Sequence, residues 1–82
     1  MLTREEIYKK LADHLTEMFE VPVEKISLEA RLAEDLDLDS IDVVDLLVKL
    51  QEITNRKLTP SEFKSVRTVN DIVDRLHAIL AA

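Results

Sequence analysis

Residues 34 to 50 read E-D-L-D-L-D-S-I-D-V-V-D-L-L-V-K-L. Asp39 and Asp42 have the spacing of a capping box, in which each side chain accepts a hydrogen bond from the other residue's backbone N–H at the start of a helix. From Ser40 to about Thr54 the residues are mostly apolar, and at 100° per residue the polar ones fall within a sector of about 80°. That polar band consists of Asp42, Asp45, Lys49 and Glu52. We therefore expect a central helix that shows solvent one mostly acidic edge.

Three more capping boxes predict three more helix starts. They pair Thr3 with Glu6, Thr59 with Glu62, and Thr68 with Asp71. The corresponding helices are predicted from Arg4 to about Phe19, from Pro60 to about Ser65, and from Val69 to about Leu80. Proline suits the first position of a helix because its missing N–H would be unpaired there anyway. The expected fold is all-α: a small four-helix bundle with three longer helices and one short third helix.

The apolar residues indicate which faces of these helices are buried. The first helix has an inward stripe of Ile7, Leu11, Leu15 and Met18, and the last has Val69, Ile72, Val73, Leu76 and Leu80. Val21 and Pro22 end the first helix, and the residues from there to about Leu38 are predicted to form a long loop. Its apolar residues Ile26, Leu28, Leu32 and Leu36 are available to pack against the helices. A loop of this length usually has a function or its own packing.

Composition limits the classes of protein that fit. The chain has 82 residues, no Cys, no Gly and a net charge of -6, which favours one helical domain over residues 1–82 without disulfides. The negative charge argues against nucleic acid and anionic membrane as partners and favours basic protein surfaces. The first twenty residues are charged throughout, and no run of residues is apolar for long enough to span a membrane. We expect a soluble, cytoplasmic monomer.

The acidic cluster around Ser40 has two readings. Six of the twelve residues from 34 to 45 are acidic and none is basic, so the cluster is either a solvated face or a recognition surface. Ser40 itself falls at the first helical position, with its hydroxyl exposed and the positive end of the helix dipole close by. A phosphodiester would be favourably placed there, although nearby carboxylates offset part of that benefit. An ordinary helix-start serine fits the same pattern, and the local chemistry leaves both readings open.

The segment from residue 34 to residue 50 resembles the attachment region of acyl carrier proteins, which have the pattern E-D-L-G-x-D-S-L-D/E. The resemblance extends to the order of the elements, with L-T-P-S-E-F opening the short helix and T-V-N-D-I-V opening the last one. It implies that Ser40 carries 4′-phosphopantetheine. It also implies a recognition surface for basic residues of partner enzymes, formed by Asp39, Asp42, Asp45 and Glu52, with Ile41 as an apolar contact.

By this resemblance the chain holds acyl intermediates as thioesters and delivers them to enzymes of fatty acid, polyketide or related biosynthesis. The implied partners are a phosphopantetheinyl transferase and the acyl-loading and synthase enzymes, and no catalytic or metal-binding residue is expected. Aminoacyl and D-alanyl carriers share this outline and remain alternatives. Asp37 stands where the family commonly has Gly and Ile41 where Leu is commonest, which suggests a specialised carrier. Asp tolerates a left-handed backbone, so the turn at residue 37 can be kept.

Phe63 bears on the size of the cargo. In this family an acyl chain can enter between the second helix and the short third helix, where long-chain carriers often have a small residue at this position. A phenylalanine ring has about 150–250 Å² of surface to bury. Phe63 is therefore either an ordinary core residue or a block that restricts the carrier to short cargo.

Three other functions fit parts of the sequence. D-L-D-L-D from Asp35 has carboxylates at positions 1, 3 and 5 of a calcium loop, but Ser40 replaces the glycine at position 6 and Leu46 the glutamate at position 12. His14 and His77 are expected at ordinary helical surface positions, without the spacing of a catalytic or metal site. A helical interaction module without a prosthetic group is the third alternative, with its second helix docking in a partner's groove.

Overall fold

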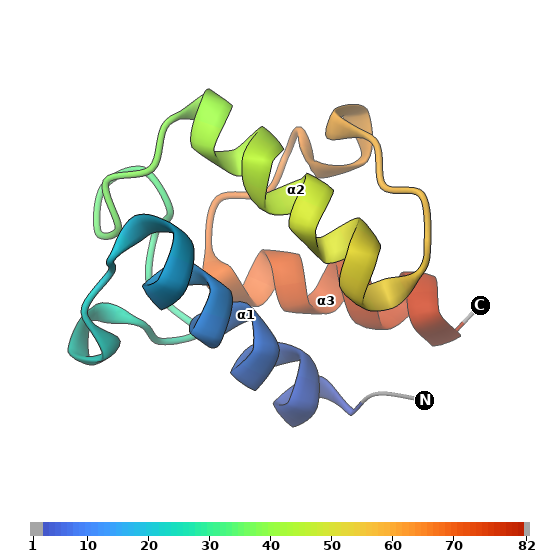
Figure 1. Cartoon of the computed structure of the whole chain (residues 1–82), viewed down its shortest axis with the longest axis horizontal. Helices are drawn as coiled ribbons and strands as arrows, with labels where there is room; N and C mark the ends of the chain where they lie inside the picture. The colour runs from blue at the N-terminus through green and yellow to red at the C-terminus, as the bar shows by residue number, and fades with distance from the viewer. Residues whose placement is uncertain (1–2, 82) are drawn as a thin grey trace.

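Three α-helices form most of the structure, a computed structural model that describes residues 3–81. The elements are α1 (Arg4–Phe19), η1 (Val23–Lys25), α2 (Ser40–Thr54), η2 (Pro60–Phe63) and α3 (Val69–Ala81), where η denotes a 3-10 helix. In Figure 1 α1 and α2 run in opposite chain directions, and α3 crosses behind them. The all-α class, the three longer helices and the long loop between α1 and α2 are as predicted. None of the helices between residues 3 and 81 is both long and apolar enough to span a bilayer.

Three of the four capping boxes are formed. At α1, Thr3 Oγ1 accepts from the N–H of Glu6 while the Glu6 carboxylate accepts from the N–H of Thr3. The same reciprocal bonds join Asp39 with Asp42 at α2, and Thr68 with Asp71 at α3. The hydrogen bonds from backbone N–H groups hold the pKa values of the Glu6 and Asp71 carboxyls below their ordinary range, because these bonds favour the ionised form. The starts of all three α-helices are therefore fixed locally by the sequence.

The predicted short third helix differs from the structure in type and length. Pro60–Phe63 is one turn of 3-10 helix and ends before the predicted Ser65. The N–H of Glu62 donates to the backbone carbonyl of Thr59 at 3.1 Å, so the Thr59 hydroxyl does not cap it and lies 3.1 Å from Ser61 Oγ instead. The tighter hydrogen bonding of a 3-10 turn thus replaces the predicted capping box.

Two of the helices end in left-handed residues, although the chain has no glycine to adopt this conformation cheaply. Glu20 has φ of 56° after α1, and Asn55 has φ of 54° after α2. At α1 the N–H of Glu20 reaches Thr16 O at 3.0 Å, and the N–H of Val21 reaches Leu15 O at 3.4 Å. These bonds satisfy the last carbonyls of the helix, as a glycine C-cap would.

The core lies where the three α-helices meet, and it confirms most of the predicted inward stripes. Buried residues of the helices are Ile7, Leu11, Leu15, Leu46, Leu47, Leu50, Val69, Ile72, Val73 and Leu76. Leu80 is partly buried and packs against this core. Met18 was predicted on the inward stripe of α1, but it is 37% exposed and does not belong to the core.

The long loop has its own packing, as its length predicted. Its residues Ile26, Leu32 and Leu36 are buried, whereas Leu28 is 40% exposed and does not pack into the core as expected. The Leu28 backbone carbonyl nevertheless accepts from the N–H of Asn70 at 2.9 Å. Arg31 and Thr68 form an isolated antiparallel bridge in the same place. The loop is therefore hydrogen-bonded to the segment that leads into α3.

Candidate functional site

Ser40 is exposed and is the first residue of α2. The cap that positions it is made by its neighbours: Asp39 Oδ1 accepts from the N–H of Asp42 at 2.9 Å, and Asp42 Oδ2 accepts from the N–H of Asp39 at 3.2 Å. Within residues 3–81 no side chain or backbone group hydrogen-bonds to the Ser40 hydroxyl. The helix start therefore holds Ser40 in place while leaving Oγ available for chemistry.

The carboxylates near Ser40 differ in how they are compensated. Arg31 forms ion pairs with Glu34 at 3.2 Å and with Asp35 at 3.4 Å. The backbone N–H and guanidinium of Arg31 lower the pKa of the Asp35 carboxyl by hydrogen bonding to its ionised form. At the far end of α2, Lys49 pairs with Glu52 at 3.4 Å.

The remaining acids of this region have no such cation. Asp37, Asp39 and Asp45 are exposed and Asp42 is half-buried, and among the described residues no Lys or Arg lies within ion-pair distance of them. The negative charge is thus concentrated around the first two turns of α2, on both sides of Ser40.

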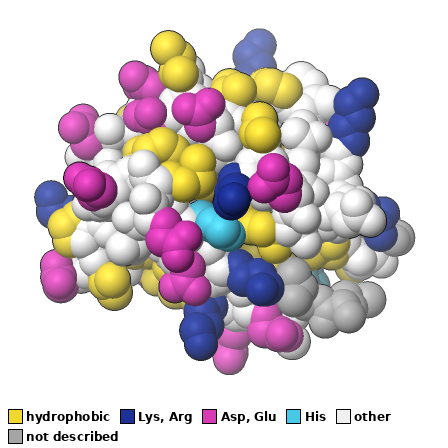
Figure 2. Space-filling model, viewed as in Figure 1, with side chains coloured by type: hydrophobic (Ala, Val, Ile, Leu, Met, Phe, Trp, Pro, Cys, Tyr) yellow, Lys and Arg dark blue, Asp and Glu magenta, His cyan; other side chains and the backbone are white. Residues whose placement is uncertain are grey.

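The outward face of α2 also carries an apolar row, which corrects the prediction of one mostly acidic edge. Ile41 is 71% exposed, Val44 is 42% exposed and Val48 is 52% exposed. Their spacing of three and four residues puts them on one side of the helix. Figure 2 shows hydrophobic and acidic side chains next to one another over the upper half of this face, where α2 lies. The structure thus leaves predicted contact residues Asp39, Ile41, Asp45 and Glu52 accessible.

The helical periodicity of this segment did not predict that Val44 and Val48 are exposed. A helix that is apolar nearly all round was interpreted as a buried central helix. The alternative meaning of an apolar row beside charged residues is a surface for another macromolecule.

A cavity of about 440 Å³ opens beside Ser40, between the first turns of α2 and the segment around η2. Its wall is mainly apolar and includes Phe63, which is 4% exposed. The other apolar wall residues are Leu32, Ala33, Leu38, Val43, Val44, Pro60 and Val66. Four charged residues complete the wall: Glu34, Asp39, Lys64 and Arg67. Ser40 thus stands at an opening suited to a flexible group that is mostly apolar.

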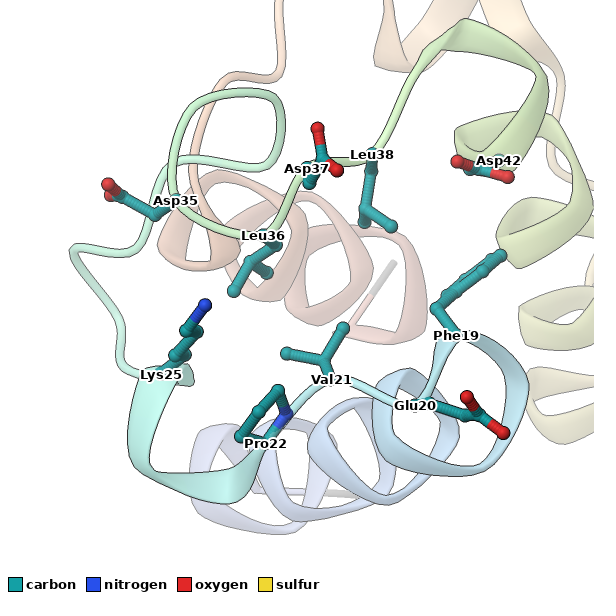
Figure 3. Close-up of a pocket in the computed structure, with 10 residues that line it drawn as sticks. All are labelled: Phe19, Glu20, Val21, Pro22, Lys25, Asp35, Leu36, Asp37, Leu38 and Asp42. Atoms are coloured by element: carbon teal, nitrogen blue, oxygen red, sulfur yellow. The ribbon is translucent and has the colours of Figure 1, made fainter.

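A smaller hollow of about 260 Å³ lies on the other side of Leu38, which lines both. In Figure 3 Val21, Leu36 and Leu38 point toward one another, with Asp35 and Lys25 toward one end. Asp37 also lines this hollow, and its φ of 57° shows the left-handed turn that the sequence allowed. The segment before Ser40 is therefore shaped by one left-handed residue and two buried leucines.

The structure also bears on the possible calcium loop and on the two histidines. Helix α2 begins at Ser40, inside the stretch that a calcium loop would need, and among residues 3–81 no three His, Asp or Glu side chains are grouped to hold a metal ion. His14 and His77 lie on α1 and α3 and are half-buried rather than fully exposed. His14 Nδ1 is buried and has no hydrogen-bond partner among the described residues.

An exposed serine with a free hydroxyl, a helix N-terminus beneath it and a cavity beside it fit the attachment of a phosphate-linked arm. The profile of the phosphopantetheine attachment site matches residues 9–76. "Acyl carrier protein 2" of Ralstonia nicotianae is 47% identical over 81 residues, 99% of this chain and 100% of the relative. "Acyl carrier protein" of Coprothermobacter proteolyticus is 32% identical over 79 residues, 96% of each chain. "Acyl carrier protein" of Thermotoga maritima is 34% identical over 73 residues, 89% of this chain and 90% of the relative.

These matches cover most of the chain, including α1, α2 and η2 and the greater part of α3. The prosthetic group of such a domain is 4′-phosphopantetheine, and the family consists of carriers rather than catalysts. The chain belongs to the acyl carrier protein family.

Proposed function

We propose that Ser40 is the attachment site and that the chain carries acyl groups on a 4′-phosphopantetheine arm without catalysing a reaction itself. The observation that carries this assignment is the exposed Ser40 at the first position of α2, with no hydrogen-bond partner for Oγ among residues 3–81. When attached, the arm supplies a thiol that holds the cargo as a thioester.

The attachment step is carried out by a partner transferase on coenzyme A. Ser40 Oγ forms a bond to the phosphorus next to the pantetheine, the pyrophosphate linkage breaks, and adenosine bisphosphate leaves. The hydroxyl proton passes to a base of the transferase or to water. Ser40 lies at the N-terminus of α2, so the helix dipole favours the negative charge of the resulting phosphodiester, although the N–H of Asp42 is already bonded to Asp39.

The outward face of α2 is the proposed docking surface for partner enzymes. The proposed contact residues are Asp39, Ile41, Asp42, Asp45 and Glu52, to which the exposed Val44 and Val48 are added. Carboxylates attract a basic partner surface and speed its approach, and the apolar row adds contact area once the surfaces meet. Such mixed surfaces suit contacts that must form and dissociate at each transfer.

The assignment of the chain as a carrier also leads to a proposal for its domain organisation, location and pathway. We propose a single carrier domain over residues 1–82 that acts as a cytoplasmic monomer and delivers acyl groups in fatty acid, polyketide or related biosynthesis. An aminoacyl or D-alanyl carrier is the second candidate, because the same arm carries both kinds of cargo. A helical interaction module without an arm is the candidate from another class.

Intact mass spectrometry tests the assignment directly. Wild type, Ser40→Ala and the control Ser65→Ala, which removes another exposed hydroxyl, are incubated with coenzyme A and a broad-specificity transferase. We expect wild type and Ser65→Ala to gain one arm and Ser40→Ala to gain none. An unmodified wild type would favour the interaction module, and a modified Ser40→Ala would move the site elsewhere.

A further inference from the structure

A groove of about 570 Å³ lies between the start of α1, the long loop and α3. Tyr8, Leu28 and Val73 give it a mainly apolar surface. The groove contains no residue of α2 and shares no residue with the cavity beside Ser40. In Figure 1 the start of α1 and the start of α2 lie at opposite edges of the molecule. The groove is therefore separate from the attachment site, and the function proposed above gives it no role.

Leu28 presents apolar surface in this groove, unlike the other leucine and isoleucine side chains of the long loop. Ile26, Leu32 and Leu36 are buried, whereas Leu28 is 40% exposed. Its backbone is nevertheless fixed, because its carbonyl oxygen accepts the N–H of Asn70 at 2.9 Å. A leucine held at the surface by a main-chain hydrogen bond offers contact area to another molecule.

Polar contacts between the three walls hold the groove open in a defined shape. The Tyr8 hydroxyl donates to the carbonyl oxygen of Ile26 at 3.2 Å, which joins α1 to the loop. The Arg4 guanidinium forms an ion pair with Asp74 and donates to Asn70 Oδ1 at 2.8 Å, which joins α1 to α3. The groove is therefore preformed, so that binding requires little ordering of its walls.

The charges of the groove wall indicate what kind of ligand it accepts. Arg4 is the one cation in the wall, and its charge is compensated by Asp74. Glu5 and Glu29 also line the groove and are exposed, and neither takes part in an ion pair among the residues that the structure describes. An apolar group next to a cation matches this surface, whereas an anion is repelled by it and by the net charge of -6.

From this arrangement we propose that the groove docks a segment of another protein in which a leucine-like side chain lies next to a lysine or arginine. The apolar side chain contacts the apolar surface of the groove, and the cation meets Glu5 and Glu29. Anionic lipids and nucleic acids do not match these charges, and a second copy of the chain has the same net charge of -6. Because Ser40 lies outside the groove, the bound partner holds the carrier while the attachment site remains accessible.

Disulfide trapping tests the proposed chemistry. The chain has no cysteine, so Ser27→Cys places a single thiol in the groove wall of the protein without its arm. In a thiol exchange buffer the variant is equilibrated with equal concentrations of the blocked tripeptides Cys-Leu-Lys, Cys-Leu-Glu and Cys-Ser-Lys, and the mixed disulfides are measured by intact mass. Ser61→Cys is the matched control, because Ser61 is also exposed and lies outside the groove.

Two preferences are expected at the groove thiol. Cys-Leu-Lys should be favoured over Cys-Leu-Glu by about 3–10-fold more than at the control thiol, which corresponds to one or two surface ion pairs. It should also be favoured over Cys-Ser-Lys by about 3-fold or more, because the leucine is partly buried. Glu5→Gln/Glu29→Gln in the Ser27→Cys background should abolish the preference for lysine and keep the preference for leucine. Glu17→Gln/Glu24→Gln makes the same change of charge at exposed positions outside the groove and should keep both.

Equal preferences at the two thiols, or an equal loss in the two double variants, would reduce the effect to net charge and overturn the proposal. Two further measurements decide between occupants. A dimer in sedimentation equilibrium that Leu28→Asn dissociates would make the occupant a second copy of the chain. Changes of the amide NMR shifts at residues 5, 28 and 73 when the arm is attached would make the occupant the arm. The trapping experiment needs no arm, so its result and a failure of the proposed attachment to Ser40 are independent.

Discussion

The backbone N–H of Leu32 donates to the carbonyl oxygen of Arg67 at 2.9 Å. This bond, together with the one from the N–H of Val69 to the carbonyl of Ala30 at 3.0 Å, joins the long loop to the segment between η2 and α3. Leu32 and Arg67 both line the cavity beside Ser40. The wall of that cavity is therefore held by main-chain hydrogen bonds between parts of the chain that are distant in sequence.

The left-handed residues that end α1 and α2 give a first prediction. Glu20→Gly should stabilise the fold by about 0.5–1 kcal/mol, because glycine adopts positive φ without the steric cost that glutamate pays. Asn55→Gly should change stability less, because asparagine tolerates this conformation better. Urea unfolding measures both, and a larger gain at Asn55 than at Glu20 would contradict the argument.

Charge reversals at Asp42 and Asp45 should differ in their effect on stability. Asp42→Lys removes the carboxylate that accepts the N–H of Asp39, so we expect a loss of about 0.5–2 kcal/mol of stability. Asp45 is exposed and makes no such bond among residues 3–81, so Asp45→Lys should change stability by no more than about 0.5 kcal/mol.

Both reversals should slow loading by the transferase, and most at low salt, because screening weakens the attraction between surface charges. Thermal melts and initial loading rates at two ionic strengths provide the measurements. If Asp45→Lys unfolded the domain and left the loading rate unchanged, its role would be structural.

The apolar row of α2 predicts a loss of docking without a loss of folding. Val48→Asn should leave the melting temperature nearly unchanged, because Val48 is 52% exposed, yet it should weaken binding to the transferase. Val23→Asn is the matched control, since Val23 is 68% exposed and lies in η1, away from α2. Binding constants from calorimetry decide the matter, and equal losses in both variants would remove the special role of α2.

Local chemistry explains why the starts of the three α-helices were predictable. A threonine or aspartate three residues before an acidic residue fixes a helix start through bonds that span four residues, as between Thr3 and Glu6. The prediction was wrong at Thr59, because Pro60 and the short segment after it form the tighter 3-10 turn, in which the backbone carbonyl takes the bond. Capping patterns therefore predict helix starts well only where a longer helix follows.

The exposure of the apolar residues of α2 depends on tertiary packing and was not predictable from periodicity. Leu46, Leu47 and Leu50 face the core, while Val44 and Val48 of the same helix remain exposed. When a helix is apolar on most sides, its periodicity does not indicate which side is buried against the other helices. The position of Lys64 and Arg67 in the cavity wall was not predicted either, because the loop contacts that build the cavity join residues far apart in sequence.

Asp71 gives the fold a component of acid sensitivity. Hydrogen bonds from the backbone N–H groups of Arg67 and Thr68 lower the pKa of its carboxyl from the ordinary value of 3.8. The stabilisation is fully present above the pKa of the unfolded chain and is lost as the pH falls from about 4 through the folded pKa. Asp71→Asn should therefore weaken the dependence of unfolding free energy on pH in this range.

The control for this pH series is Asp13→Asn, which removes the same charge from an exposed position of α1. Asp13 has no hydrogen bond to a backbone N–H among the described residues, so its replacement should leave more of the acid dependence in place. Urea titrations between pH 2.5 and 6 measure the slope. A slope equally reduced in both variants would mean that overall charge, rather than the cap of α3, sets the acid sensitivity.

Phe63 provides the last prediction, which concerns the length of the cargo. Its ring is buried in the wall of the cavity beside Ser40 and takes up space that an acyl chain needs. In wild type, a ten-carbon acyl group should therefore stabilise the loaded protein no more than a six-carbon one. Phe63→Leu keeps an apolar side chain while opening the cavity, so the ten-carbon group should gain an advantage in melting temperature and resist thioester hydrolysis better. Phe63→Ala opens the cavity further but costs about 3–5 kcal/mol, which is much of the roughly 4–12 kcal/mol available to a domain of this length. If the longer chain already stabilised wild type as much as it stabilises Phe63→Leu, Phe63 would be an ordinary core residue and would not limit cargo length.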